Sequence, residues 1–277
     1  MNYISGEKFV ELSTFIYNKN VGKYDDYYHY THTFDLEKIK ESIDTPIIYT
    51  TTYLVEFLLS DLKECKREII LITHNADLCV DESLFIKKPD CVKIWFSQNV
   101  DYVNPILNSL PIGLENSIWY VNLNKQNKIR GKVNEEKRIK NLVYMNHSIR
   151  TNPNERQKPY NLLHEKSWVT TDMRANGQLF NEYLDNIYNH KFVICPRGNG
   201  IDTHRTWECL YVNTIPIEKR NINNQFYTDL PICFVDDWEE ITEDFLEKEY
   251  LRINDIKWNL NKLDFDYWKN KITNHAI

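Results

Sequence analysis

The chain has 277 residues, of which 42% are hydrophobic and 27% charged, enough for one large or two modest domains with apolar cores. Its net charge of -6 argues against a general nucleic-acid binder, which needs a basic face. No run reaches the roughly 18 apolar residues of a membrane span, and the N-terminus lacks the apolar core of a signal peptide. We therefore expect a cytoplasmic protein.

The first half of the chain alternates predicted strands and helices. Residues 1–43 are polar and rich in tyrosine, and we expect mostly helix and loop there. Apolar runs predict strands at residues 46–49, 68–73, 91–96 and 109–114, and a helix over residues 53–65. Such alternation is typical of a mostly parallel sheet. The polar, aperiodic stretch 122–138 is the predicted linker, so we expect domains at 1–130 and 131–277.

The second half repeats this alternation. Strands are predicted at residues 141–145, 168–171, 192–195, 214–217 and 231–235, and helices at residues 153–165, 177–189, 203–212 and 238–251. A last amphipathic helix over residues 264–272 could pack back on the first domain. The six cysteines include no C-x-x-C pair, which indicates reduced thiols rather than zinc ligands or disulfides.

Residues 191–217 give the clearest functional signal. A buried strand leads through a Pro/Gly loop into a helix that Asp202 or Thr203 can cap. The free backbone N–H groups and the dipole at such a helix start attract anions. Arg197 and Arg205 add charge there, and Glu208 lies where a carboxylate could bind sugar hydroxyls. Alternatively, Arg205 and Glu208 form an ordinary surface ion pair that contributes only about 0.2–0.5 kcal/mol.

These motifs resemble the C-terminal signature of the exostosin-like glycosyltransferases. The matching residues are Cys195-Pro196-Arg197-Gly198, Arg205-Thr206-Trp207-Glu208-Cys209-Leu210 and Ile215-Pro216-Ile217. Upstream strings at 73–77, 95–101 and 147–152 resemble small bacterial and virus-encoded members, so the likeness spans roughly residues 69–235. Glu218 departs from the family, which usually continues with apolar residues.

The resemblance implies a GT-B fold, with two Rossmann-like α/β domains facing a cleft and a nucleotide sugar held mainly by the second. It implies an inverting transferase without a cofactor or an essential metal. The expected donor is a UDP-sugar such as UDP-xylose, with galactose and glucuronic acid also open, and the acceptor is a glycan hydroxyl. If the protein is virus-encoded, the host cytoplasm is its expected location.

Site residues follow from the motifs and the resemblance together. The expected donor-binding residues are Ser148, Arg150, Arg197, Gly198, Thr203, Arg205 and Glu208. The catalytic base should come from the first domain, with Asp77 as the first choice and Asp101 as the second, because each follows a predicted strand. His74 is a weaker candidate, and Asp77 could instead be a helix cap or a turn residue.

Other patterns that suggest a function also have simpler structural interpretations. Asp264-Phe265-Asp266 spells a D-x-D metal motif but lies at the start of a predicted helix, and His29 and His32 follow Asp25 and Asp26 in a polar stretch. The aromatic residues Tyr24, Tyr27, Tyr28, Tyr30 and Phe34 could stack on sugars or simply pack. Alternative functions are a non-catalytic carbohydrate- or nucleotide-binding protein of the same fold, and another nucleotide-using enzyme such as a dehydrogenase. Neither half has a clean G-x-G-x-x-G motif, which argues against the dehydrogenase.

Overall fold

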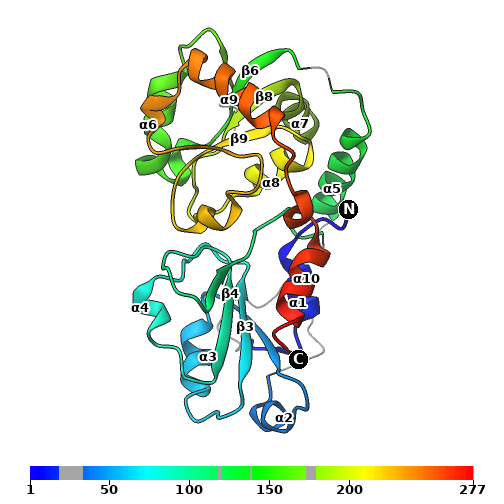
Figure 1. Ribbon diagram of the computed structural model, residues 1–277, viewed down its shortest axis with the longest axis vertical. Helices are drawn as coiled ribbons and strands as arrows, with labels where there is room; N and C mark the ends of the chain where they lie inside the picture. The colour runs from blue at the N-terminus through cyan, green and yellow to red at the C-terminus, as the bar shows by residue number, and fades with distance from the viewer. Residues whose placement is uncertain (19–33, 118–119, 138, 173–178, 277) are drawn as a thin grey trace. The chain divides into compact units, whose positions relative to one another are not determined.

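The computed structural model describes residues 1–18, 34–117, 120–137, 139–172 and 179–276, which form a mixed α/β structure (Figure 1). The chain divides into two compact units: unit 1 is Met1–Ile112 with Asp264–Ile277, and unit 2 is Gly113–Leu263. The boundary at residue 112 differs from the predicted boundary at residue 130. The last helix, whose return to the first domain was considered above, groups with unit 1.

The N-terminal aromatic and histidine patterns fall largely outside the described residues. This applies to the tyrosines from Tyr24 to Tyr30 and to the cluster that ends at His32. Phe34 is described and packs edge-on against Tyr17, with 4.9 Å between ring centroids. Packing therefore accounts for this member of the aromatic run.

Unit 1 is built on a parallel sheet whose described strands follow one another in chain order. They are β1 (Phe15–Ile16), β2 (Ile47–Thr51), β3 (Ile69–His74), β4 (Val92–Ser97) and β5 (Leu107–Ser109). The predictions of β2, β3 and β4 are confirmed. Buried parallel strands are apolar along their whole length, so the sequence reveals them. The strand predicted over residues 109–114 is wrong, since β5 ends at Ser109 and Pro111 has no N–H for a sheet ladder.

The loops after β3 and β4 share one unusual backbone conformation. Asn75 and Asn99 both adopt left-handed conformations, with φ of 56° and 60°, which asparagine tolerates better than most residues. The Asn75 N–H donates to Gln98 Oε1 at 3.0 Å, and the Asn99 side-chain amide donates to the Ala76 carbonyl at 3.0 Å. The polar residues that follow these strands therefore fix the two loops against each other.

Helices cover both faces of the unit 1 sheet. α1 (Gly6–Leu12) and α10 (Phe265–Thr273) lie on one face, and α3 (Val55–Asp61) lies on the other (Figure 1). Two short helices, α2 (Leu36–Glu41) and α4 (Glu82–Phe85), lie in the connections. α10 buries Phe265, Trp268 and Ile272, and the Phe265 ring packs edge-on against Phe9 at 5.3 Å. The C-terminal segment thus completes the core of unit 1.

Unit 2 has a second parallel sheet, in which the strand order reverses. Its described strands are β6 (Asn141–Met145), β7 (Val169–Thr171), β8 (His190–Ile194), β9 (Ile215–Lys219) and β10 (Cys233–Val235). The order across the sheet is β10-β9-β8-β6-β7, so the chain builds outward in opposite directions from β6. These strands confirm the five predicted ones, and β9 continues through Glu218. A doubly wound sheet of this order has a topological switch point between β6 and β8.

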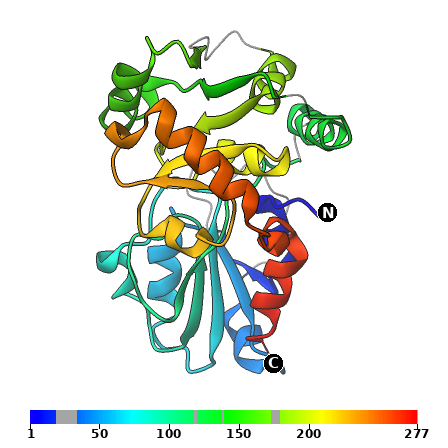
Figure 2. The same ribbon diagram turned by 45° about the horizontal axis from the view of Figure 1, so that its top comes forward.

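The helices of unit 2 pack around this sheet. They are α5 (Tyr120–Val133), α6 (Pro153–Leu163), α7 (Phe180–Asn189), α8 (His204–Tyr211) and α9 (Glu243–Asp255), with short 3-10 turns η1 (Ile149–Thr151), η2 (Asn223–Tyr227), η3 (Trp238–Glu240) and η4 (Leu260–Leu263). α9 lies across the sheet (Figure 2) and buries Leu246 and Ile253 in the core of unit 2. The single helix predicted over residues 238–251 is wrong in detail. Thr242 starts a new helix there by accepting the Phe245 N–H at 3.2 Å.

The predicted linker is wrong, because most of residues 122–138 form α5. Few of its apolar side chains are buried, and Ile129 is one of these few. The helix therefore has little apolar periodicity. Polar contacts hold it instead: Lys132 Nζ lies 2.6 Å from Asp185 Oδ1 of α7, and Gln126 Nε2 donates to the Glu115 carbonyl at 2.8 Å. A helix stabilised in this way has no hydrophobic pattern by which it could be recognised.

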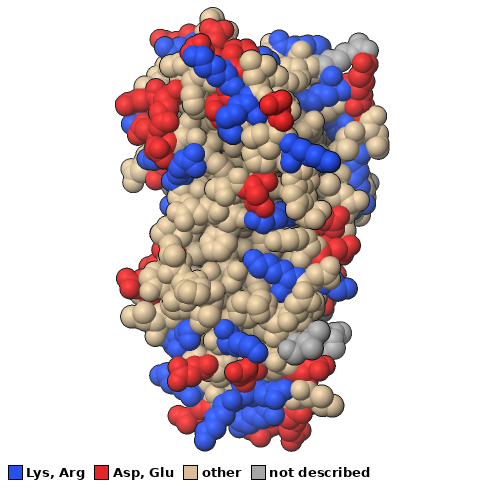
Figure 3. Space-filling view, in the orientation of Figure 1, with Lys and Arg blue, Asp and Glu red and all other residues tan. Residues whose placement is uncertain are grey.

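Two surface features bear on partners. Within the described part of the chain, no helix has the length and apolar run that a bilayer crossing requires. On the face drawn in Figure 3, basic and acidic side chains are interspersed rather than gathered into one basic patch.

Gly6 makes a contact that a larger residue would disrupt. A Cβ at Gly6 would lie 1.9 Å from Asn75 Oδ1 and 2.8 Å from His74 Nδ1. His74 is fully buried, and the Asn75 amide donates to the Tyr49 hydroxyl at 2.9 Å, so neither side chain can move freely. We expect Gly6→Ala to lower the free energy of unfolding by about 1–3 kcal/mol, as other overpacked sites do. Urea denaturation measures this.

The matched control is Gly131→Ala in α5, where an added Cβ would meet nothing within 4 Å. Alanine favours a helix interior over glycine by about 1 kcal/mol, so this change should be neutral or stabilising. Equal stability of the Gly6→Ala and Gly131→Ala proteins would contradict the predicted clash.

Candidate functional site

The candidate site lies at the carboxyl ends of β6 and β8. In doubly wound sheets, ligands bind outside the carboxyl ends of the strands at the switch point. The loop after β6 carries His147 and Ser148, and the loop after β8 carries Arg197 and Gly198. The strand order of unit 2 therefore brings together two of the motifs identified in the sequence.

Arg156 ties these two loops to each other. It lies on α6 with 9% of its surface exposed, and its Nε donates to the Arg197 carbonyl at 2.9 Å. Its Nη1 donates to the Ser148 carbonyl at 3.0 Å. Asn152 adds a parallel link, because its side-chain amide donates to the Gly198 carbonyl at 2.8 Å. The loops after β6 and β8 are thus held by side chains from the start of α6.

Glycine at position 198 allows the close approach of Arg156. A Cβ there would lie 3.0 Å from Arg156 Nη2, which is tighter than an ordinary contact. The glycine of the C-P-R-G motif thus has a packing role as well as any role in a ligand site.

A second group of contacts lies on α8 and α7. Arg205 Nε donates to the Tyr183 hydroxyl at 3.3 Å, and that hydroxyl donates to Glu208 Oε2 at 2.6 Å. Arg205 and Glu208 therefore do not form the simple surface ion pair considered from the sequence. They are connected through Tyr183, and Glu208 is buried with 8% exposure. Burial and the charge of Glu208 raise the pKa of Tyr183 well above its ordinary value, so its hydroxyl keeps its proton.

The site concentrates positive charge. Among the described residues, no carboxylate forms an ion pair with Arg156, Arg197 or Arg205, and the buried Nε of Arg197 has no hydrogen-bond partner. Burial, and after it the charge of Arg205, lower the pKa of Arg156 to about 10. Arg156 and Arg205 lie close enough for their charges to affect each other, with Glu208 as the carboxylate whose charge acts on Arg205. An excess of guanidinium charge over carboxylate charge favours an additional anion as a neighbour.

His147 belongs to the same cluster. It is 1% exposed, and its Nε2 lies 3.0 Å from the Arg156 carbonyl. Burial and the charges of Arg205 and Arg156 lower the pKa of His147 to about 4, so the ring is neutral near pH 7. Because Nε2 must carry the proton that the carbonyl accepts, Nδ1 is a buried acceptor, and it has no partner among the described residues.

Three predicted donor residues are less firmly connected. Arg150 is exposed on η1, and no described contact joins it to Arg197 or Arg205. Ser148 contributes its backbone carbonyl to Arg156. Thr203 occupies the N-cap position of α8 without a side-chain cap bond, and its Oγ1 lies 3.4 Å from Thr206 Oγ1. The structure thus joins the side chains of Arg205 and Glu208 to a buried network and binds the backbone carbonyls of Arg197, Gly198 and Ser148. It leaves the side chains of Arg150, Ser148 and Thr203 outside these networks.

The start of α8 is fixed by Asp202 rather than by Thr203. Both carboxylate oxygens of Asp202 accept Trp207 Nε1 at 2.9 Å, and Oδ1 also accepts the Thr203 N–H at 2.8 Å. The Trp207 ring, 1% exposed, packs edge-on against Tyr227 at 5.2 Å. Glu218, the departure from the family pattern, accepts hydrogen bonds from Thr206 and Asn224. Asp202, Thr206 and Trp207 therefore anchor the helix that presents Arg205.

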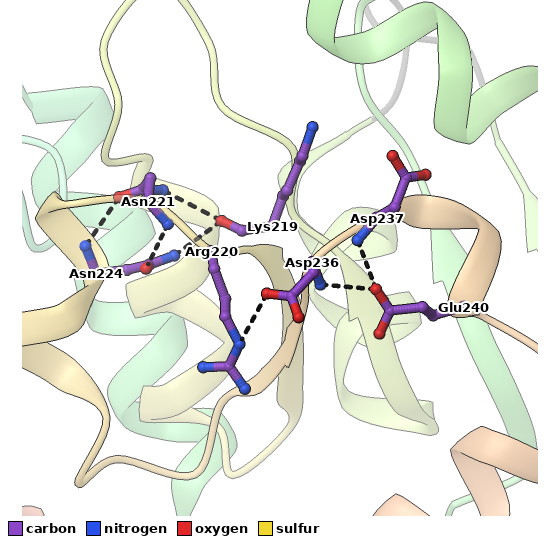
Figure 4. Close-up of polar contacts among 7 residues, drawn as sticks. All are labelled: Lys219, Arg220, Asn221, Asn224, Asp236, Asp237 and Glu240. Carbon is purple, nitrogen blue, oxygen red and sulfur yellow. Dashed lines mark hydrogen bonds and ion pairs between the residues drawn. The ribbon is translucent and has the colours of Figure 1, made fainter.

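At the carboxyl ends of β9 and β10, several polar groups bond to one another (Figure 4). Arg220 Nε lies 3.3 Å from Asp236 Oδ1, and Glu240 accepts the N–H groups of Asp236 and Asp237 at 2.9 and 2.6 Å. Asn221 and Asn224 exchange side-chain to backbone hydrogen bonds, each 2.9 Å long. Arg220 thus has an ion-pair partner, which the arginines of the switch point lack among the described residues.

In unit 1, the predicted bases are accessible and His74 is not. Asp77 and Asp101 are both exposed in the loops that follow β3 and β4. His74 is fully buried, and its Nε2 lies 3.1 Å from the Pro111 carbonyl. His74 is therefore a core residue that fixes the chain after β5, and it is not available as a base.

The D-x-D sequence of unit 1 forms a helix cap. Asp264 Oδ1 accepts the Asp266 N–H at 3.0 Å, and Asp264 Oδ2 accepts the Asn2 N–H at 3.0 Å. A search of the described residues finds no group of three or more His, Cys, Asp or Glu side chains that could hold a metal ion. The two aspartates thus start α10 and join it to the N-terminal segment.

Comparison of the chain with models of protein families and with curated protein sequences gave no significant match. The likeness to exostosin-like transferases therefore depends on the motifs themselves, and the function below is inferred from the site.

Proposed function

We propose that this protein is a glycosyltransferase of the GT-B type that binds the diphosphate of a nucleotide sugar at the carboxyl ends of β6 and β8. The observation that carries the proposal is the cluster of guanidinium groups at the switch point of unit 2, none of which forms an ion pair with a carboxylate among the described residues. The resemblance of residues 195–217 to exostosin-like transferases supports the reaction class.

In this proposal, the arginines stabilise the charge that develops on the leaving diphosphate. Arg205 and Arg197 bind phosphate oxygens, Arg150 reaches the phosphate from η1, and Ser148 and Thr203 offer hydroxyl donors. Preorganised donors of this kind do the work that a metal ion does in other transferases. Glu208 accepts a ribose hydroxyl through Oε1, because Tyr183 already occupies Oε2.

The proposed reaction is a single in-line displacement with inversion. A carboxylate removes the proton of the acceptor glycan hydroxyl, the hydroxyl oxygen bonds to the anomeric carbon, and the nucleoside diphosphate leaves with the electron pair. The donor is a UDP-sugar, with UDP-xylose as the first to be tested. The base is Asp77, or Asp101 in its place, because both carboxylates are accessible.

Ligand-induced stabilisation tests the binding half of the proposal. UDP should raise the unfolding temperature more than GDP or NAD does, because a ligand that binds only the folded state stabilises it. Stabilisation by NAD alone would point to the dehydrogenase alternative. Release or transfer of sugar from the bound UDP-sugar then separates an enzyme from a non-catalytic binding protein.

The base assignment is tested by Asp77→Asn and Asp101→Asn. Loss of a general base lowers the rate roughly 10²–10⁴-fold, and we expect that loss in Asp77→Asn with UDP affinity unchanged. Both side chains are exposed, so neither change should affect stability by more than about 0.5 kcal/mol. If transfer activity falls only in Asp101→Asn, the roles are exchanged. Nearly full activity in both variants would remove both residues from the mechanism.

A further inference from the structure

His147 is a titratable group of the candidate site to which the function proposed above gives no role. It lies on the loop after β6, and its neighbours come from two elements, Arg156 on α6 and Arg205 on α8. An unpartnered acceptor in the interior is costly, on the order of 1–3 kcal/mol, and therefore needs an explanation. Nδ1 of His147 is such an atom.

We propose that His147 binds the diphosphate by taking up a proton when the nucleotide enters, so that Nδ1–H donates to a phosphate oxygen while Nε2–H keeps its bond to the Arg156 carbonyl. This inference rests on the function proposed above. The proton comes from solvent, and no covalent bond of the ligand changes. His147 is then a binding residue whose charge follows the occupancy of the site.

The surrounding charges explain why the proton is absent without ligand. Arg156 and Arg205 both repel a second positive charge on the imidazole, and burial adds to that effect. The other titratable groups around the cluster act on the arginines: Tyr183 contacts Arg205, the charge of Glu208 acts on Arg205, and the buried Cys195 thiol lies near Arg156. Among the described residues, no carboxylate contacts His147 to offset the guanidinium charges.

A bound diphosphate reverses this balance. Its negative charge screens both guanidinium groups and attracts a positive imidazole, so the pKa of His147 rises on binding. By linkage, a group whose pKa is higher in the complex strengthens binding as the pH falls toward its free value. The affinity for nucleotide should therefore increase from pH 7 to pH 5, and it should level off below the free pKa of about 4.

Calorimetry with UDP tests the proposal directly. Titrations at about pH 6 in two buffers of different ionisation enthalpy give the number of protons taken up per UDP bound. The variant is His147→Gln, whose amide can keep the bond to the Arg156 carbonyl but cannot titrate. Wild type should take up close to one proton more than His147→Gln, and its affinity advantage should grow up to about tenfold per pH unit on acidification. The terminal phosphate of UDP also titrates near pH 6, but it does so equally with both proteins.

His190→Gln is the matched control. His190 is also buried, and burial also lowers its pKa, but it bonds Asn186 and Thr170 at the amino-terminal end of β8. Its replacement should leave proton uptake on UDP binding as in wild type.

The outcomes separate the two proposals. UDP binding with equal proton uptake and equal pH dependence in wild type and His147→Gln overturns the role of His147 and leaves the donor site standing. Absence of binding by UDP, GDP and pyrophosphate overturns both. If His147→Gln does not fold, nitrogen-15 spectra of the wild-type imidazoles give the same answer. The His147 ring should carry one proton without UDP and two with it at about pH 6, and an unchanged ring overturns the proposal.

Discussion

Replacement of Arg205 by lysine should weaken UDP binding roughly 10- to 100-fold, because hydrogen bonds to charged groups contribute about 1.5–3 kcal/mol. Lysine keeps the charge but loses the planar fork that binds two phosphate oxygens at once. It also loses the contact of the guanidinium with Tyr183, whose ring centroid lies 5.7 Å from Arg205 Cζ. Turnover of a UDP-sugar should fall further, by about 10²–10³-fold, since the leaving-group charge develops at this position.

Arg220→Lys is the control for this prediction. Arg220 lies just beyond β9 at the same edge of the sheet, but it pairs with Asp236 and is exposed. An exposed ion pair contributes little, so its replacement should leave UDP affinity within about twofold of wild type. Calorimetry with UDP measures both variants. Equal affinities for Arg205→Lys and wild type would remove Arg205 from the proposed donor site.

Trp207→Ala should cause the largest loss of stability among the substitutions considered. The side chain is almost fully buried, and its removal leaves a cavity and an Asp202 carboxylate without its main partner. Loss of a buried tryptophan costs about 3–5 kcal/mol, and loss of its hydrogen bonds to the buried Asp202 carboxylate adds to that. Because Asp202 and Trp207 together hold the start of α8, Arg205 should lose its position and UDP binding should be lost as well.

Hydrogen exchange measures this effect where it occurs. The amides of β8 and β9 should exchange faster in Trp207→Ala, whereas those of β3 and β4 should be unchanged because they belong to unit 1. Trp207→Phe keeps most of the volume but removes the donor, and should cost a smaller amount, about 1–3 kcal/mol. Unchanged exchange in β8 and β9 of Trp207→Ala would contradict the anchoring role.

The central strands could be predicted from the sequence, and α5 could not. Buried parallel strands such as β3 and β8 are apolar throughout, so their composition alone marks them. α5 is held by pairs such as Lys132 with Asp185, whose partners lie 53 residues apart in the chain (185 − 132). Contacts of this kind depend on the fold, and a local pattern does not reveal them.

The candidate site could likewise be predicted only in part. Arg197 and Arg205 could be predicted, because glycine, proline and arginine between a strand and a helix start indicate an anion site. The roles of Tyr183 and Arg156 could not be predicted, because each bonds a residue distant in the sequence. The unpartnered Nδ1 of His147 is likewise visible only in the folded structure. Two buried side chains joined by a hydrogen bond have no signature along the chain. The reversal of strand order at β6 brings those segments to one edge of the unit 2 sheet.

The return of α10 to unit 1 has a consequence for biosynthesis. Phe9 is translated early, but its partner Phe265 emerges only after the 151 residues of unit 2 (263 − 113 + 1). At about 5–20 residues per second, a nascent unit 1 waits roughly ten to thirty seconds on the ribosome with part of its apolar surface uncovered. Unit 2 is continuous and can fold during that interval. Chaperones that shield exposed hydrophobic surface should therefore engage unit 1 before α10 is made and release it once α10 has emerged.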